Sequence, residues 1–140
     1  MIFLDTTVLL YAVGESHPLK PACQEIVRLI LSQELQATTT IEVIQEFTHV
    51  RSRRRSREDA AHYARSYAGL LQPLVVIEDI DLHAGLEIFE QVPRLGAFDA
   101  VLAAVARRLG ASSLVSADTA FGLVSGLSWV TPDALLEGIR

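Results

Sequence analysis

Short apolar runs alternate along this chain with longer segments whose apolar residues recur at helical spacing, and this alternation constrains the fold most. Because strands that are separated by helices are joined by crossover connections, they pair mainly in parallel. We therefore predict an α/β fold, one domain spanning residues 1–140, with a mainly parallel central sheet of four to five strands and helices on both faces. The expected strands are Ile2–Leu4, Leu35–Thr39, Leu74–Ile77, Ser113–Ser116 and, as a possible fifth, Leu127–Val130.

The segments between these runs carry helix start and stop signals. Thr40 and Ser56 are candidate N-caps, Gly14 and Gly110 follow helix ends, and Pro93 ends another helix. Seven helices are predicted, at about 6–14, 18–33, 41 into an arginine run, 57–71, 81–92, 98–109 and from 131 onward.

Composition restricts the class of protein. Half of the residues are apolar and 21% are charged, which excludes a disordered chain. The single cysteine, Cys23, excludes an intrachain disulfide scaffold and is expected in the core. The longest apolar runs, Val8–Val13 and Ala100–Ala106, are far shorter than the ~20 residues of a membrane span, and no basic stretch precedes an N-terminal apolar core. We expect a soluble cytoplasmic protein with no membrane association.

The net charge is 12 − 17 = −5, yet the positive charge is concentrated in one run. Such a basic patch on an acidic body can attract a polyanion locally. We predict that it contacts RNA phosphates or an acidic segment of a protein partner. The alternative is a solvated helix end, where cations stabilise the negative terminus. The arginines of this run are Arg51, Arg53, Arg54, Arg55 and Arg57.

Several acids fall where the ends of parallel strands would meet. Asp5 directly follows the first strand, and Asp118 follows the strand ending at Ser116 by two residues. Asp99 lies in the first turn of the helix that precedes that strand. Glu42 and Glu46 are one turn apart on one face of the helix after the second strand. Because ligands bind at the carboxyl ends of strands in open α/β sheets, we expect these acids to converge there.

Gathered carboxylates repel one another unless a cation lies among them. Mg²⁺ and Mn²⁺ prefer oxygen ligands and bind through a few carboxylates, waters and substrate phosphates. The chemistry that uses such sites is metal-assisted hydrolysis of phosphodiesters. Each acid alone also has an ordinary interpretation, as a helix cap, a turn residue or an exposed helix acid.

Four segments in order resemble the motifs of the PIN domain, and within that family the VapC-type toxins of bacterial VapBC pairs. The first is MIFLDTT at residues 1–7, and the second is TTTIEVIQEF at 38–47. The third is AFDAVLAAVARRLG at 97–110, and the fourth is LVSAD at 114–118. The resemblance extends over essentially the whole chain.

This resemblance implies an endoribonuclease toxin that depends on Mg²⁺, or on Mn²⁺, and is neutralised by a VapB-type antitoxin. It implies that Asp5, Asp99 and Asp118 bind the metal and that Glu46 completes the catalytic set, with Glu42 as the alternative glutamate. It also implies that Thr6 or Ser116 orients the carboxylates. Members of the family often form homodimers.

Two other functions remain open at this point. An acidic Mg²⁺ phosphatase with Asp5 as nucleophile would need a second acid where Thr7 stands and a downstream lysine, whereas Lys20 is the only lysine. A catalytically silent PIN-like module would bind RNA or protein without cleaving. His17, His49, His62 and His83 form no metal-binding pattern, and no glycine-rich phosphate loop is present.

Overall fold

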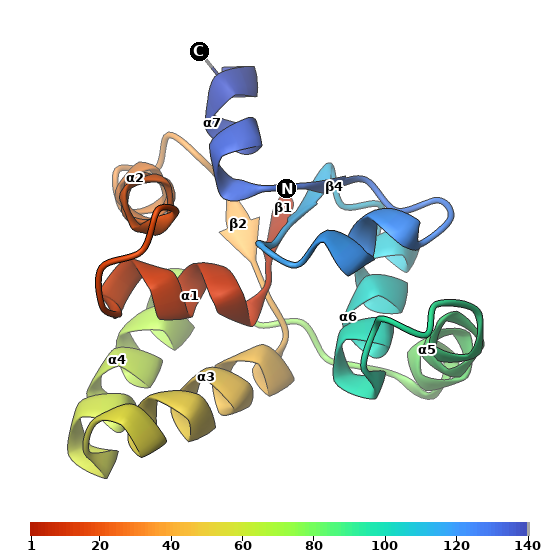
Figure 1. Cartoon of the computed structure of the whole chain (residues 1–140), viewed down its shortest axis with the longest axis horizontal. Helices are drawn as coiled ribbons and strands as arrows, with labels where there is room; N and C mark the ends of the chain where they lie inside the picture. Colours follow the sequence, from red (N-terminus) through yellow and green to blue (C-terminus); the bar gives the residue numbers. More distant parts are fainter. Residues whose placement is uncertain (140) are drawn as a thin grey trace.

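The computed structural model describes residues 1–139 and contains a parallel sheet at its centre (Figure 1). The strand order is β2-β1-β3-β4, and every pairing is parallel. Ile2 stands opposite Ala37 on one side and Ser113 on the other. The α/β fold with a parallel sheet is therefore confirmed. The strands are β1 (Ile2–Leu4), β2 (Ala37–Thr38), β3 (Ser113–Val115) and β4 (Trp129–Val130).

Seven α-helices flank the strands in the described part of the chain, as the sequence predicted. In Figure 1, α1 to α4 lie to one side of the strands and α5 and α6 to the other. A short 3₁₀ helix, η1 (Thr119–Leu123), follows β3 and was not predicted. The helices are α1 (Thr6–Val13), α2 (Lys20–Leu31), α3 (Ile41–Arg54), α4 (Arg57–Leu70), α5 (Asp79–Gln91), α6 (Ala97–Arg108) and α7 (Pro132–Ile139).

Side-chain caps determine where three of these helices begin. Thr40 Oγ1 accepts the Val43 amide at 3.2 Å, and Ser56 Oγ accepts the Asp59 amide at 3.0 Å, as the sequence indicated. Helix α5 begins two residues before the predicted Asp81, because Glu78 and Asp81 form a capping box. Asp81 is also buried and paired with Arg108 of α6, with Nε 2.6 Å from Oδ1. This ion pair joins α5 to α6.

The predicted strand at Leu74–Ile77 is wrong. A single parallel bridge joins Thr40 to Val75, with one backbone hydrogen bond from the Val75 amide to the Thr39 carbonyl. The segment passes the edge of the sheet beside β2, which is only two residues long, and then enters the cap of α5. Val76 is 65% exposed. Leu74 and Ile77 thus pack against the core without extending the sheet.

The core fills the space between the sheet and its helices. Cys23 is fully buried, as expected, and burial raises the pKa of its thiol to about 12. Close packing of α5 on α6 depends on Gly85, where an added Cβ would meet Val101 at 2.6–2.8 Å. Among residues 1–139, no helix has the length and apolar character to cross a membrane. The largest fully buried side chains include Leu4, Leu9, Ile26, Phe47, Leu114 and Phe121.

Candidate active site

Asp5 lies at the carboxyl end of β1 and is only 3% exposed. Two hydroxyl groups hold its carboxylate: Ser116 Oγ donates to Oδ2 at 2.6 Å, and Thr7 Oγ1 donates to the same oxygen at 3.0 Å. Ser116 follows β3, which pairs directly with β1. The neighbouring parallel strands therefore bring residues 111 positions apart into contact, as the sheet topology predicted.

Thr7 is a site residue that the sequence reasoning did not identify. Its Oγ1 donates to Asp5 and also accepts the Ala117 amide at 3.1 Å, so it bridges the ends of β1 and β3. The available signal was its position two residues after an acid that caps a helix. Thr6, which was predicted to orient the carboxylates, is buried; its Oγ1 makes no hydrogen bond of standard geometry with the described residues, but it lies close enough to the Glu46 carboxylate to lower the pKa of that group.

Asp118 lies beside the same strand ends. Its backbone amide donates to Ser116 Oγ at 3.0 Å, and its Oδ1 accepts the Ala120 amide at 2.9 Å, which caps η1. Asp118 is thus both a helix cap, where its ordinary interpretation was a turn residue, and a neighbour of Asp5 through the Ser116 hydroxyl.

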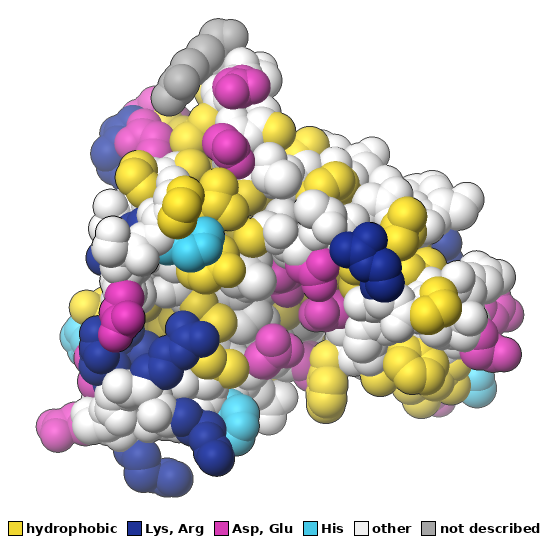
Figure 2. Space-filling model, viewed as in Figure 1, with side chains coloured by type: hydrophobic (Ala, Val, Ile, Leu, Met, Phe, Trp, Pro, Cys, Tyr) yellow, Lys and Arg dark blue, Asp and Glu magenta, His cyan; other side chains and the backbone are white. Residues whose placement is uncertain are grey.

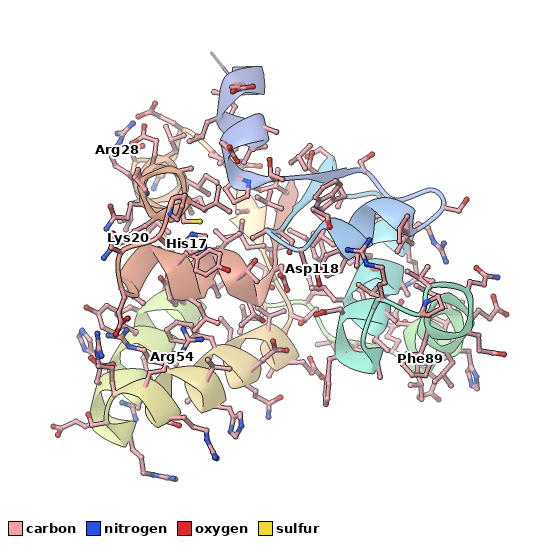
Figure 3. The ribbon with its side chains drawn as sticks, viewed as in Figure 1. His17, Lys20, Arg28, Arg54, Phe89 and Asp118 are labelled. Atoms are coloured by element: carbon pink, nitrogen blue, oxygen red, sulfur yellow. The ribbon has the colours of Figure 1, made fainter. Side chains whose placement is uncertain are left out.

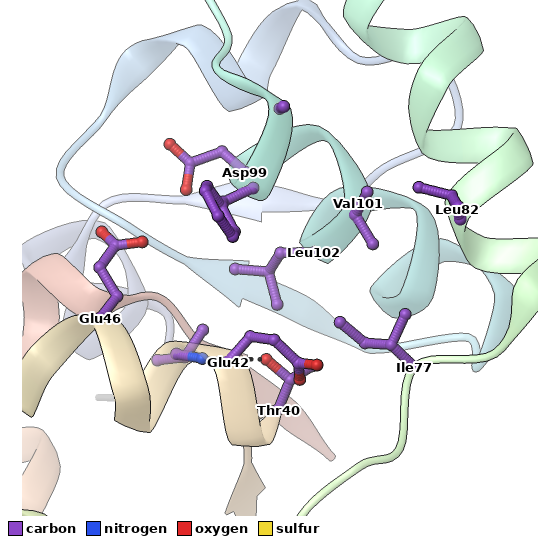
Figure 4. Close-up of a pocket in the computed structure, with 11 residues that line it drawn as sticks. Thr40, Glu42, Glu46, Ile77, Leu82, Asp99, Val101 and Leu102 are labelled. Atoms are coloured by element: carbon purple, nitrogen blue, oxygen red, sulfur yellow. Dashed lines mark hydrogen bonds between the residues drawn. The ribbon is translucent and has the colours of Figure 1, made fainter.

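Asp99 lies in the first turn of α6, and the effect of other charges on its pKa indicates that four carboxylates face one region. Its pKa is raised to about 7, first by burial and then by the negative charges of Asp5, Glu46 and Asp118. Burial followed by the Asp5 charge also raises the pKa of Glu46, whereas the Thr6 hydroxyl lowers it. Figure 4 shows Glu46 on α3 and Asp99 on α6 on the same side of a cleft. We call Asp5, Glu46, Asp99 and Asp118 the acidic group.

The structure separates Glu46 from Glu42. Glu42 is one turn earlier on α3, beside Thr40 and Ile77 at the other end of the cleft (Figure 4). Its charge is not among those that raise the pKa of Asp99 or Glu46. The glutamate that faces Asp5 is therefore Glu46.

No basic side chain neutralises the acidic group. Within residues 1–139, none of its four carboxylates lies within 4 Å of a lysine, arginine or histidine nitrogen. Burial also raises the pKa of Asp5, against the lowering effect of its hydrogen bonds to Ser116 and Thr7. The group therefore carries an uncompensated repulsion that a cation would relieve.

These oxygen donors fit a hard divalent cation. As the side chains stand, no three His, Cys, Asp or Glu residues of the described chain are arranged to bind one ion directly. Mg²⁺ does not need three direct protein ligands, because it usually keeps several waters and binds through one or two carboxylates and substrate phosphates. The buried, unpartnered Thr6 Oγ1 is a further oxygen beside Glu46.

A cleft of about 240 Å³ adjoins the acidic group. Glu46 and Asp99 lie at one end of it, and its walls are mainly apolar. Val43 comes from α3, Leu82 from α5, and Phe98, Val101 and Leu102 from α6. A substrate held at the carboxylates can therefore extend into an apolar recess.

The arginine run divides into two kinds of residue. Arg51 is buried, with Nε donating to Asp59 at 2.6 Å, NH1 donating to the Val13 carbonyl at 3.0 Å, and its guanidinium over the Tyr63 ring. The prediction that Arg51 contacts RNA is therefore withdrawn, because its donors are used by Asp59 of α4 and by the Val13 carbonyl of α1. The exposed members of the run are Arg53, Arg54, Arg55 and Arg57.

The exposed arginines and the acidic group occupy separate regions of one face. Figure 2 shows basic side chains gathered at the lower left and acidic side chains near the centre. Figure 3 shows Arg54 well away from Asp118. The arginines therefore do not neutralise the acidic group, and they remain available to a ligand that extends along this face.

Comparisons with known proteins agree with this geometry. The PIN domain family model matches residues 2–127. The chain is 49% identical over 138 residues to Ribonuclease VapC7 of Mycobacterium tuberculosis, which covers 96% of this chain and 93% of that protein. It is 30% identical over 120 residues to Ribonuclease VapC23 of the same species, covering 84% of this chain and 93% of that one.

Two solved structures share the fold at low sequence identity. One is M. tuberculosis VapC20, described as a Sarcin-Ricin loop cleaving toxin, with a TM-score of 0.75, 17% identity, and coverage of 89% of this chain and 95% of that one. The other is VapBC2 from Rickettsia felis bound to a promoter DNA fragment, with a TM-score of 0.72, 16% identity, and coverage of 94% and 98%.

Proposed function

Because this chain belongs to the PIN domain family and is a protein of the VapC type, we propose that it is a divalent-metal-dependent endoribonuclease toxin. Two relatives, at 49% and 30% identity, are named ribonucleases. The observation that carries the proposal is the acidic group: burial and then the charges of three other carboxylates raise the pKa of Asp99 to about 7, and no basic nitrogen of residues 1–139 lies within 4 Å of the group. Mg²⁺ is the proposed cation, with Mn²⁺ able to replace it.

The residues of the acidic group have different proposed roles. Asp5, Asp99 and Asp118 would hold the metal, and Ser116 and Thr7 fix the Asp5 carboxylate. When bound, the metal supplies a water of lowered pKa and stabilises charge on the attacked phosphate. To Glu46, the most exposed member of the group, we assign the orientation of the water for attack on an RNA phosphodiester. We expect products with 5′-phosphate and 3′-hydroxyl ends.

The exposed arginines extend the proposed RNA-binding surface. Arg53, Arg54, Arg55 and Arg57 lie at the end of α3 and the start of α4, away from the acidic group. Contacts from arginine to phosphate position an RNA without reading its sequence. We therefore assign these side chains to substrate positioning.

The proposed partners follow from the VapC type. The structural relatives include VapBC2 from R. felis and a toxin–antitoxin complex from Klebsiella pneumoniae, with a TM-score of 0.67 and 13% identity. By likeness to these, we propose that a VapB-type antitoxin neutralises this protein in the cytoplasm. We also propose that the active form is a homodimer.

The test is cleavage of RNA by purified protein with Mg²⁺ and with EDTA. Wild type should cut only with the metal, and Asp5→Asn and Asp99→Asn should lose at least 100-fold in rate, which removal of one strong electrostatic contribution typically costs. Asp79→Asn, the same change at an exposed position of α5, is the matched control. Wild-type rates in the Asp99→Asn variant would overturn the proposal.

The two alternatives are tested in the same assay. Hydrolysis of a phosphomonoester with no cleavage of RNA would indicate the phosphatase, and no cleavage of any RNA would indicate the silent binding module. The hydroxyl of Thr7, which donates to Asp5, occupies the position where the phosphatase would need its second acid. The acidic group and the named relatives favour the nuclease.

A further inference from the structure

The cleft beside the acidic group contains a polar side chain that the cleavage reaction does not use. Glu42 Oε1 is buried and has no hydrogen-bond partner among residues 1–139. In Figure 4 the Glu42 side chain lies next to Thr40 and Ile77, at the end of the cleft away from Glu46 and Asp99. A buried acceptor without a donor lowers the stability of the fold. A ligand that brings N–H groups to this end of the cleft would satisfy Glu42 Oε1, and the complex would be stabilised.

The mouth of the same cleft has an exposed aromatic ring. Phe98 lines the cleft, is 77% exposed, and directly precedes Asp99. Single-stranded RNA is recognised by bases that are turned out of the strand, stacked on aromatic side chains and hydrogen-bonded along their edges. Phe98 is placed to stack on such a base while the adjoining phosphate faces Asp99 and Glu46.

The dimensions of the cleft restrict its occupant. Its volume, about 240 Å³, is below the ~300–1,000 Å³ of pockets for drug-sized ligands, which suits one heterocyclic ring system. Its walls are apolar, with Val43, Leu82, Val101 and Leu102 among them. The polar groups lie only at the two ends. This arrangement fits a nucleotide whose phosphate would be held through the proposed cation at the Glu46 and Asp99 end, with the hydrogen-bonding edge of its base at the other.

We propose that this cleft is a specificity pocket that binds one nucleobase next to the cleaved phosphate and prefers guanine through Glu42. An ionised carboxylate is only an acceptor. Guanine presents two adjacent donors, N1–H and the N2 amino group, whereas the pairing edges of adenine, cytosine and uracil have no two adjacent donors. The proposal rests on the proposed nuclease function, because it assigns that function a base preference.

The first test uses free nucleosides, which carry no phosphate and require neither metal nor cleavage. Binding of guanosine, inosine, adenosine, cytidine and uridine to the intact protein would be measured by NMR titration. Guanosine should bind about tenfold or more tightly than inosine, which lacks the N2 amino group, because a good bidentate contact discriminates by that amount. Glu42→Gln should remove this difference, and thermal unfolding would confirm that the variant is folded.

The second test maps cleavage sites in an RNA of randomised sequence. Wild type should show guanine at one fixed position beside the cut, and Glu42→Gln should lose that preference. Phe98→Ala should weaken RNA binding about tenfold or more, since stacking of a base on an aromatic ring has that value. Phe89→Ala is the matched control, because it removes a partly exposed ring from α5, and Phe89 does not line the cleft.

Three results would contradict the proposal that this cleft binds a nucleobase and prefers guanine. One is equal binding of all five nucleosides, and another is cleavage of RNA without preference beside the cut. The third is a change of oligomeric state in Phe98→Ala by sedimentation, which would make the cleft a protein interface. Failure of the nuclease function is distinguishable, because a protein that cuts no RNA would still bind guanosine in preference to inosine.

Discussion

Replacement of Asp99 by Asn should stabilise the metal-free protein, although it should abolish cleavage. In the folded chain, burial and three neighbouring carboxylates raise the pKa of Asp99 from 3.8 to about 7. One pH unit corresponds to about 1.4 kcal/mol, so the whole displacement corresponds to about 4 kcal/mol as an upper bound. Because the side chain is only partly buried, screening by water reduces the expected gain to about 1–2 kcal/mol.

The gain should depend on pH with a defined sign. Below about pH 4 Asp99 is protonated in both the folded and the unfolded chain, so Asn changes little. Between pH 4 and 7 only the unfolded chain releases the proton, so wild-type stability falls as pH rises, and above pH 7 the penalty is complete. Asn removes this penalty, so the gain should be larger at pH 8 than at pH 4.5.

Urea unfolding in EDTA at pH 4.5 and pH 8 measures this difference. Glu90→Gln, the same chemical change at an exposed position of α5, should change stability by less than about 0.5 kcal/mol at both pH values. Loss of stability in Asp99→Asn at pH 8, or a gain that does not vary with pH, would refute the inference that the acidic group is strained by its own charges.

Three further predictions concern residues outside the acidic group. Arg51→Ala should destabilise the fold by about 2 kcal/mol in urea unfolding, because it removes buried charged hydrogen bonds that join α3 to α4 and α1, and no loss would contradict that role. Gly85→Ala should cost about 1–3 kcal/mol in the same assay, because the new Cβ would meet the Val101 backbone, and a neutral result would show that α5 moves away freely. Charge reversal at Arg53 and Arg54 should flatten the salt dependence of RNA binding, and an unchanged slope would show that these side chains are only solvated.

The parallel pairing of the strands and most of the acidic group could be predicted because both depend on short patterns. An acid that directly follows a buried strand, such as Asp5, is placed by the chain itself, and parallel pairing brings the end of β3 to it. The resemblance favoured Glu46 and kept Glu42 as the alternative, because spacing alone does not separate two residues that share one face of α3. Only the packing of that helix against α1, which follows Asp5, decides which of them faces Asp5.

The wrong predictions for Arg51 and Leu74–Ile77 have the same cause, because tertiary contacts decide both. Arg51 resembles its neighbours in the sequence, and only the approach of Asp59 from α4 and the Val13 carbonyl shows that it is buried. Leu74–Ile77 has the composition of a strand, but β2 offers it too short an edge for more than one bridge. In each case the local pattern was silent about the tertiary partner.

The most direct test of the account is whether one divalent cation binds among Asp5, Asp99 and Asp118. Mn²⁺ titrated into ¹⁵N-labelled protein broadens the amide signals of nuclei close to the ion. We predict that the amides of Thr7, Ala117 and Asp118 broaden first, that Asp99→Asn weakens this effect at least tenfold, and that Mg²⁺ competes with it. If Mn²⁺ leaves these amides unchanged while it broadens others, or none, the acidic group is not a metal site and the proposed nuclease chemistry fails.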